Sequence, residues 1–312
     1  MENLGDVLMK FRGINPLSAT RYVTNLQNLY KKISSDDDVP NNFEWLKRID
    51  PIIVALEGYS DSTQRNYLNA VIVAYRANFA NDEILSQYEE MRDKLNDSYM
   101  ESTTGKTVKQ QENWITLEEF DDIIKDYREK SRESREKPFN LSKSEKQSFQ
   151  DYLLLSLYRQ LPVRNDFADM KVINKREYNR LNSAEKQISN FLVTKDKKPL
   201  FFSMNEYKTS QKYQEKKLDV PEDLKKDIKK WLKLNQTGFF LINVRTDKPM
   251  SPNSLTKTLN RLFFKKFKKK ISTTMLRRIY LTQKYGQIKN DMKADADMMG
   301  HSEEAQNIYI KA

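Results

Sequence analysis

Apolar side chains recur every three or four residues through most of this 312-residue chain, and this spacing predicts a mainly helical fold. In residues 16–33, for example, it places Tyr22, Leu26 and Leu29 on one helix face. Thr116, followed by Glu119, predicts a capping box at the start of another helix. The same spacing predicts helices over residues 41–49, 60–79, 114–130, 145–162, 221–234, 253–270 and 273–286.

The pattern changes between residues 190 and 221. The runs NFLVTKD, LFFSMNEYK and KKLDVP are short, β-branched and aromatic, and Lys, Asp and Pro separate them, which predicts a small antiparallel sheet. The polar stretch SYMESTTGKTVKQQEN resembles a linker. We therefore expect a helical domain over residues 1–100, a linker over 101–113 and an α-rich domain with the small sheet over 114–312.

Three residue types are scarce or absent, and this limits the chemistry. The chain has no Cys, one His and seven Gly. It therefore has no disulfides, no Cys-based zinc site, no histidine cluster and no glycine-rich phosphate loop. We expect a protein that works without a metal and without a cofactor.

The net charge of +11 predicts a polyanionic partner such as double-stranded DNA. Its distribution is uneven, because residues 1–100 hold 11 Lys and Arg against 15 Asp and Glu, whereas the remainder holds 44 against 29. No apolar run is long enough to span a membrane, and the start MENLGDVLMKF lacks the features of a secretory signal. We expect an intracellular protein, in the cytoplasm or nucleus, that is neither secreted nor in a membrane.

Four basic landmarks and a tyrosine carry the functional prediction. Arg164, Lys208, Arg277, His301 and Tyr309 occur in this order. Singly, each has an ordinary explanation, since an Arg after a helix is usually a surface or capping residue, a Lys in a turn is one of many, and a Tyr often packs in a core. Together they make chemical sense, because a phenol with a pKa of about 10 attacks poorly at neutral pH unless cations lie nearby. Arginines and an imidazole would also stabilise the growing charge on an attacked phosphodiester.

These residues resemble those of the tyrosine recombinases, the phage-integrase family. LYRQLPVRNDFADMKV resembles the family's first box, an Arg after an apolar helix with an acidic residue and a hydrophobic strand behind it. YKTSQKYQEKKLDVP resembles the hairpin that bears the catalytic Lys, and TMLRR the His-x-x-Arg box. MMGHSEEAQNIY resembles the last motif, Gly-His-Ser followed by a Tyr, and is the most specific match. Order and approximate spacing agree over residues 115–312, and residues 1–100 resemble the family's core-binding domain.

The resemblance implies a site-specific recombinase or integrase that acts as a homotetramer on paired DNA sites. Tyr309 would attack a DNA phosphate to give a 3′-phosphotyrosine and a free 5′ hydroxyl, so that strands are rejoined without ATP or metal. Arg164 and Arg277 would clamp the phosphate, His301 would bind a non-bridging oxygen and Lys208 would be the general acid.

The chain departs from the family pattern at several positions. Thr274 stands where the second box usually has His, and Arg278 stands where another His is common. Asp166 and Asp169 straddle the usual acidic position, which leaves open which of them supports the arginines. Family members usually continue past the tyrosine into a docking helix, whereas IKA follows here; either the chain is truncated or its protomers communicate through another contact.

Two other functions remain open at this stage: a type IB topoisomerase, which relaxes DNA as a monomer with the same chemistry, and a DNA-binding protein whose site has decayed. In all three cases residues 253–270 are the best candidate for lying along DNA. Leu255, Leu259, Leu262 and Phe263 would form the inner face of this helix, and its end is rich in lysine. The residues expected to contact DNA are Lys265, Lys266, Lys269 and Arg278.

Overall fold

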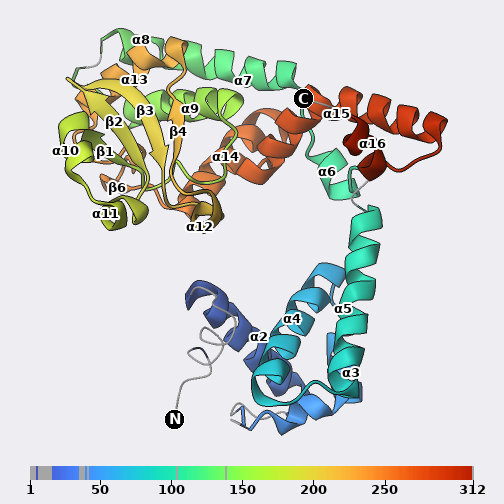
Figure 1. Ribbon diagram of the computed structural model, residues 1–312. Helices are drawn as coiled ribbons and strands as arrows, with labels where there is room; N and C mark the ends of the chain where they lie inside the picture. The colour runs from blue at the N-terminus through green and yellow to red at the C-terminus, as the bar shows by residue number, and fades with distance from the viewer. Residues whose placement is uncertain are drawn as a thin grey trace. The chain divides into compact units, whose positions relative to one another are not determined.

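The computed structural model describes Gly5 and residues 16–34, 39–40, 42–102, 105–137 and 139–310. The chain divides into two compact units, Met1–Thr107 and Val108–Ala312, which are described separately (Figure 1). The division falls inside the segment 101–113 that we expected to be a linker, although α5 (Glu83–Ser102) extends into that segment and its residues Val108–Glu112 form a short helix. The fold is mainly helical, as predicted, with a small four-stranded sheet and a two-stranded hairpin in the second unit.

The first unit is a helical cluster around one apolar core. Leu26 and Leu29 of the first long helix are fully buried, and so is Leu68. Residues 41–49 differ from the expected helix: Asn41 lies outside the described residues, Phe43 has a left-handed φ of 53°, and only a short 3₁₀ turn follows. The elements are α2 (Pro16–Ser34), η1 (Glu44–Lys47), α3 (Ile49–Leu56), α4 (Asp61–Asn78) and α5 (Glu83–Ser102).

The second unit surrounds one large core built by α9, α13 and α14. The predicted capping box forms, since Thr116 accepts from the Glu119 N–H and Glu119 accepts from the Thr116 N–H. Its first helices are α6 (Val108–Glu112), α7 (Leu117–Lys130), α8 (Arg132–Glu136) and α9 (Lys143–Gln160). The later helices are α10 (Lys175–Arg180), α11 (Ser183–Gln187), α12 (Ser210–Tyr213), α13 (Glu222–Leu234), α14 (Pro252–Phe267), α15 (Thr273–Met299) and α16 (Glu303–Tyr309).

The sheet has the order β1-β2-β3-β4 and is mixed, not purely antiparallel as expected. The strands are β1 (Lys171–Asn174), β2 (Phe191–Lys195), β3 (Lys198–Met204) and β4 (Lys216–Asp219); β5 (Ile242–Asn243) and β6 (Lys248–Pro249) form the separate hairpin. β1 pairs with β2 in parallel, because α10 and α11 carry the chain across between them, whereas β2, β3 and β4 are antiparallel neighbours.

Side chains along each strand point alternately to the two faces of the sheet, and each face packs in a different apolar core. Leu192 pairs with Phe202, and both side chains join the large core. Phe191 and Val193 point the other way and pack on Tyr178 of α10. The sheet is therefore covered on both faces, and its connections are held in defined positions.

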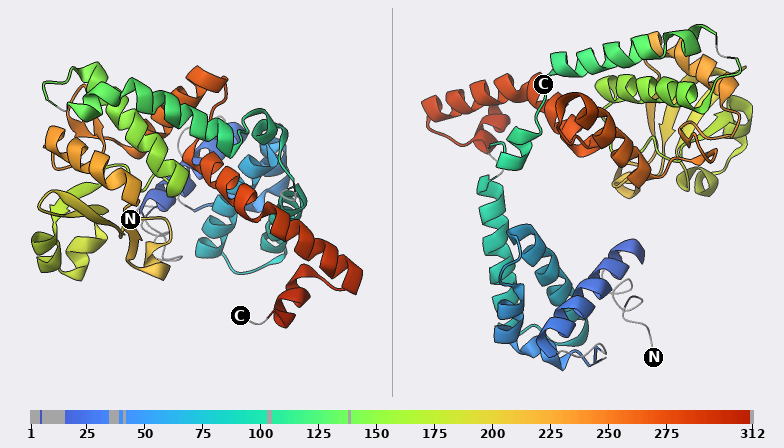
Figure 2. Two further views of the ribbon diagram at one scale, coloured as in Figure 1. Left: turned by 90° about the horizontal axis from the view of Figure 1, so that it is seen from above. Right: turned by 180° about the vertical axis from the view of Figure 1, so that it is seen from behind.

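Two boundaries near the predicted site also differ from expectation. All four apolar residues expected on the inner face of α14 are fully buried, but this helix ends at Phe267, and Lys268 forms a left-handed cap with φ 58°. Helix α15 does not end near Gly286 as expected and continues to Met299 (Figure 2).

Candidate active site: an arginine pocket and a histidine–tyrosine pair

Arg164 lies in the loop between α9 and β1, two residues after Pro162. The buried Tyr158 fixes this loop, because its hydroxyl donates to the carbonyl oxygen of Arg164 at 2.5 Å. The ring of Tyr158 packs edge-on against Phe167, with 5.6 Å between ring centroids. Burial raises the pKa of Tyr158 well above its ordinary value, so the phenol stays neutral and remains a donor.

Asp166 is the carboxylate that faces both arginines. Burial raises its pKa, while the positive charges of Arg164 and Arg277 act in the opposite direction. The pKa of Arg277 is lowered by burial and by the nearby charge of Arg164, and Asp166 offsets part of this effect. Neither arginine affects the pKa of Asp169, which burial and the charge of Glu206 raise. Of the two acids left open by the sequence, Asp166 is the one whose pKa the arginines affect.

Asn165 links the same loop to the two helices that follow in the sequence. Its carbonyl oxygen accepts from the Thr273 hydroxyl at 2.9 Å, and its amide donates to the Thr256 hydroxyl at 3.1 Å. Thr273 begins α15, and Arg277 lies one turn later on that helix. These hydrogen bonds hold the start of α15 beside the Arg164 loop.

Lys208 lies in the connection between β3 and β4, as the hairpin motif predicts, and its side chain is exposed. Asn190 positions this connection: its amide donates to the carbonyl oxygens of Asp166 and Glu206 at 3.0 and 2.9 Å. Its own carbonyl oxygen accepts from the backbone N–H groups of Asn205 and Glu206, each at 2.8 Å.

Arg164 and Lys208 consequently line one cavity of about 300 Å³. The cavity also contains Asp166, Asp169 and Glu206, so its walls carry both signs of charge. Only Asp166 faces the arginines electrostatically. The cavity with the adjacent Arg277 is called the arginine pocket below.

His301 and Tyr309 form a second group, at the far end of α15. Gly300 caps that helix with φ 69°, a left-handed conformation that favours glycine. Ser302 then accepts from the Ala305 N–H and starts α16, whose last residue is Tyr309. The rings of His301 and Tyr309 stack, with 5.8 Å between centroids and 20° between planes, and Tyr309 is 75% exposed.

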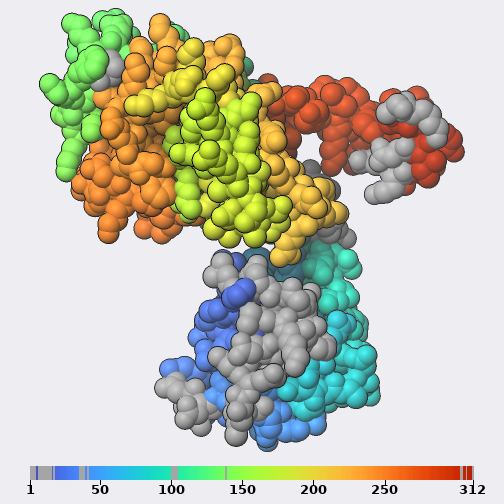
Figure 3. Space-filling model, turned by 60° about the vertical axis from the view of Figure 1, so that its left-hand side comes forward, coloured from blue at the N-terminus to red at the C-terminus, as the bar shows by residue number. Residues whose placement is uncertain are grey.

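The structure does not bring this pair to the arginine pocket. At a rise of about 1.5 Å per residue, α15 carries Gly300 about 35 Å along its axis from Arg277. Stacking on His301 keeps Tyr309 at that end, and the second half of α15 with α16 extends away from the body of the unit (Figure 3). The five predicted residues therefore form two groups, and Thr274 is exposed on the first turn of α15.

The four basic residues expected to contact DNA differ in the contacts that they make within the chain. Lys266 pairs with Asp126 at 2.6 Å, and Lys269 donates to the carbonyl oxygen of Trp114 at 2.6 Å. Lys265 and Arg278 are exposed and make no hydrogen bond or ion pair within the described part of the chain. Among the four, these two are the cations that an external phosphate can reach without breaking an internal contact.

Sequence reasoning missed Asn165 and Asn190. Both are polar residues beside elements that were expected, but their partners are backbone and hydroxyl groups distant in sequence, which no local pattern identifies. Within the described ranges, no group of three or more His, Cys, Asp or Glu side chains could hold a metal ion.

No family model matches the chain, and no curated protein matches it significantly. Among the helices of the described residues, none is long and apolar enough to cross a membrane.

Proposed function

We propose that the chain is a DNA strand-breaking and rejoining enzyme that acts through a 3′-phosphotyrosine, as a site-specific recombinase or integrase. The observation that carries the proposal is the arginine pocket: Arg164 and Lys208 line one cavity with the half-buried Asp166, and the charges of Arg164 and Arg277 both act to lower the pKa of that carboxyl. Two neighbouring guanidinium groups can donate hydrogen bonds to the two non-bridging oxygens of a phosphodiester. The resemblance of the motifs to tyrosine recombinases supports the same conclusion.

The proposed reaction replaces one ester bond to the phosphorus with another. The phenol of Tyr309 gives up its proton to water as its oxygen attacks the scissile phosphorus, and a phosphotyrosine bond forms while the bond to the 5′ oxygen breaks. Lys208 donates a proton to the leaving 5′ oxygen. Arg164 and Arg277 neutralise the charge on the non-bridging oxygens as it grows. Attack by a 5′ hydroxyl on the phosphotyrosine reverses these steps and rejoins a strand.

The separation of the two groups determines how the enzyme works. With α15 continuous from Thr273 to Met299, Tyr309 does not reach the Arg277 of its own chain. A second copy of the chain therefore supplies Tyr309 to the arginine pocket, in keeping with the proposed tetramer on paired sites. A type IB topoisomerase acts as a monomer and would need both groups together in one chain, so the structure favours the recombinase.

The test is a covalent adduct on a denaturing gel. The protein is incubated with a pool of nicked duplexes drawn from the DNA that flanks its gene, beside Tyr309→Phe and Tyr285→Phe. Tyr285 is a matched control, because it is also an exposed tyrosine on the C-terminal helices. We expect an adduct with the wild type and Tyr285→Phe and none with Tyr309→Phe.

Two results would contradict the proposal. An adduct that persists in Tyr309→Phe would assign the nucleophile to another residue. Salt-sensitive binding to the pool without any adduct would support the decayed DNA-binding protein instead.

A further inference from the structure

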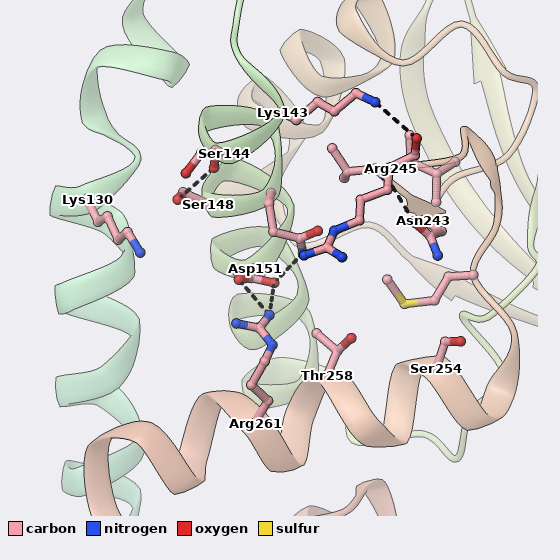
Figure 4. Close-up of a pocket in the computed structure, with 14 residues that line it drawn as sticks. Lys130, Lys143, Ser144, Ser148, Asp151, Asn243, Arg245, Ser254, Thr258 and Arg261 are labelled. Atoms are coloured by element: carbon pink, nitrogen blue, oxygen red, sulfur yellow. Dashed lines mark hydrogen bonds and ion pairs between the residues drawn. The ribbon is translucent and has the colours of Figure 1, made fainter.

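A second, larger cavity of about 680 Å³ opens among α7, α9, the β5–β6 hairpin and α14 (Figure 4). None of its lining residues lines the arginine pocket. Its volume lies in the range of about 300–1,000 Å³ that small-molecule sites occupy. The proposed strand transfer makes no use of it.

The lining of this cavity is predominantly cationic and rich in hydrogen-bond donors. Four cations face one carboxylate, Asp151. Buried apolar side chains contribute as well, among them Ile242 and Met250. The cations are Lys130, Lys143, Arg245 and Arg261, and the polar uncharged groups are Ser144, Gln147, Ser148, Asn243, Ser254 and Thr258.

Asp151 does not leave the cavity with a free negative charge. Its side chain is 4% exposed and accepts from the Arg261 guanidinium at 3.0 and 3.2 Å and from the Gln147 amide at 2.8 Å. The side chain of Arg261 is itself 52% exposed, so part of it remains accessible. The carboxylate therefore orients Arg261 and leaves donors of this side chain for a ligand.

Arg245 is held by its backbone, while its side chain is uncommitted. The backbone N–H of Arg245 donates to the side-chain oxygen of Asn243 at 3.0 Å. The Lys143 ammonium donates to the backbone carbonyl oxygen of Arg245 at 3.1 Å. Its guanidinium makes no hydrogen bond or ion pair within the described residues. In Figure 4 this guanidinium extends from the hairpin into the cavity, opposite the side chain of Arg261.

The two long helices that bound the cavity add to its preference for anions. α9 contributes Lys143 and Ser144 from its first turn, and α14 contributes Ser254 from its own. The first turn of a helix carries partial positive charge and favours an anion. The charge excess of the side chains and the two helix ends act in the same direction.

We propose that this cavity binds a small polyphosphate anion, of the class formed by the triphosphate group of a nucleotide. Guanidiniums bind phosphate through two parallel hydrogen bonds, and Arg245 and Arg261 approach the cavity from opposite walls. The hydroxyls of Ser144, Ser254 and Thr258 donate to further phosphate oxygens, whereas the Ser148 hydroxyl already donates to the carbonyl oxygen of Ser144. The apolar side chains of the β5–β6 segment accommodate the uncharged part of a nucleotide.

Isothermal titration of the full chain with sodium tripolyphosphate, and separately with ATP, tests the proposal at about 0.15 M salt, where surface charges are screened. We expect one site per chain with a dissociation constant below about 100 µM. Arg245→Gln and Lys130→Gln, both exposed positions, should each weaken binding at least about tenfold, which corresponds to one bidentate or charge-assisted contact. Lys195→Gln, an exposed lysine at the end of β2, is the matched control and should bind as the wild type does.

Absence of binding by both probes would overturn the proposal, as would equal weakening in Lys195→Gln. A short duplex DNA provides the other source of phosphate. If the duplex displaces tripolyphosphate and loses affinity in Arg245→Gln, the cavity is a contact for the DNA backbone, and the small-ligand assignment is wrong. Tyr309→Phe should bind tripolyphosphate normally, so this test and the adduct test fail independently.

Discussion

At the scale of single residues, Asn190 holds the arginine pocket together through four hydrogen bonds to backbone groups. Asn190→Ala should lower the free energy of unfolding of the second unit by about 2–4 kcal/mol, because several buried polar groups lose their partners. Denaturant unfolding followed by circular dichroism measures this change. Asn260→Ala is the control, since the Asn260 side chain makes no hydrogen bond within the described residues, and an equal loss there would contradict the explanation.

The internal contacts of the lysines lead to a prediction for DNA binding. Lys265→Gln and Arg278→Gln should each weaken binding to duplex DNA and reduce the slope of log K against log salt by about 1, because each removes one phosphate contact. Lys266→Gln should change the slope less, since Lys266 already pairs with Asp126. Titrations at several salt concentrations measure the slopes, and equal slopes for Lys265→Gln and Lys266→Gln would contradict the distinction.

Tyr178 predicts how the second unit responds to alkaline pH. Burial, together with its hydrogen bond to Glu215, raises the pKa of Tyr178 to about 12. Because this pKa is raised, the neutral phenol stabilises the folded state. The contribution is fully present below the pKa of about 10 that the phenol has in the unfolded chain, and it is lost as pH rises towards 12. The free energy of unfolding should therefore fall more steeply between pH 10 and 12 in the wild type than in Tyr178→Phe. Tyr213→Phe, at an exposed tyrosine, should follow the wild-type curve.

At the scale of elements, the periodic segments were predictable and the pairing of strands was not. The runs NFLVTKD, LFFSMNEYK and KKLDVP overlap β2, β3 and β4, because short β-branched and aromatic runs between turn residues are a local signal, but LFFSMNEYK extends beyond the end of β3 at Met204. The parallel addition of β1 depends on α10 and α11 crossing between strands, which no local pattern encodes. In the same way, motifs alone led to the prediction of Arg164, Lys208 and Arg277, whereas Asn165 and Asn190 have hydrogen-bond partners that only the fold brings near.

The end of α15 was misplaced for a related reason. Gly286 resembles a helix stop, but in the structure it lies within the helix, and Gly300 has the positive φ of a cap. The apolar residues of 287–299 are mostly Met and Ala between Lys and Asp, a weaker signal than the Leu, Ile and Tyr of residues 273–286, although Lys, Met and Ala favour a helix. The consequence is large, because this half of α15 separates the pair at its end from the arginine pocket.

Gly286→Ala tests whether continuous α15 is the working form. A methyl group here meets only Thr282 Cγ2 at 3.4 Å, and Ala favours a helix over Gly by about 1 kcal/mol. We expect adduct formation at the wild-type level and a modest gain in helix stability by thermal circular dichroism. Lys293→Ala, at an exposed position on the same half, controls for surface changes. A loss of adduct confined to Gly286→Ala would mean that α15 must bend during catalysis.

At the scale of the whole molecule, the proposed function requires chains to cooperate, because the two groups of residues that it uses lie far apart within one chain. Each chain carries an arginine pocket and, at the far end of α15, a His301–Tyr309 pair. Near the middle of α15, Leu281, Tyr285 and Ile288 are exposed apolar residues spaced for one helix face, on a segment otherwise rich in charge. If each chain places the end of its α15, with α16, against the arginine pocket of another copy, every site contains both groups of residues.

Complementation between two inactive variants tests this exchange. Tyr309→Phe retains the pocket, and Arg277→Gln retains the nucleophile, so neither alone should form an adduct. An equal mixture should recover on the order of a quarter of the wild-type yield, because one of four ordered pairings of copies supplies both intact groups. The adduct should contain only the Arg277→Gln chain, which a size tag on that chain reveals on the gel. A mixture that stays inactive, with both variants folded, would show that each chain completes its own site and that α15 must rearrange to allow it.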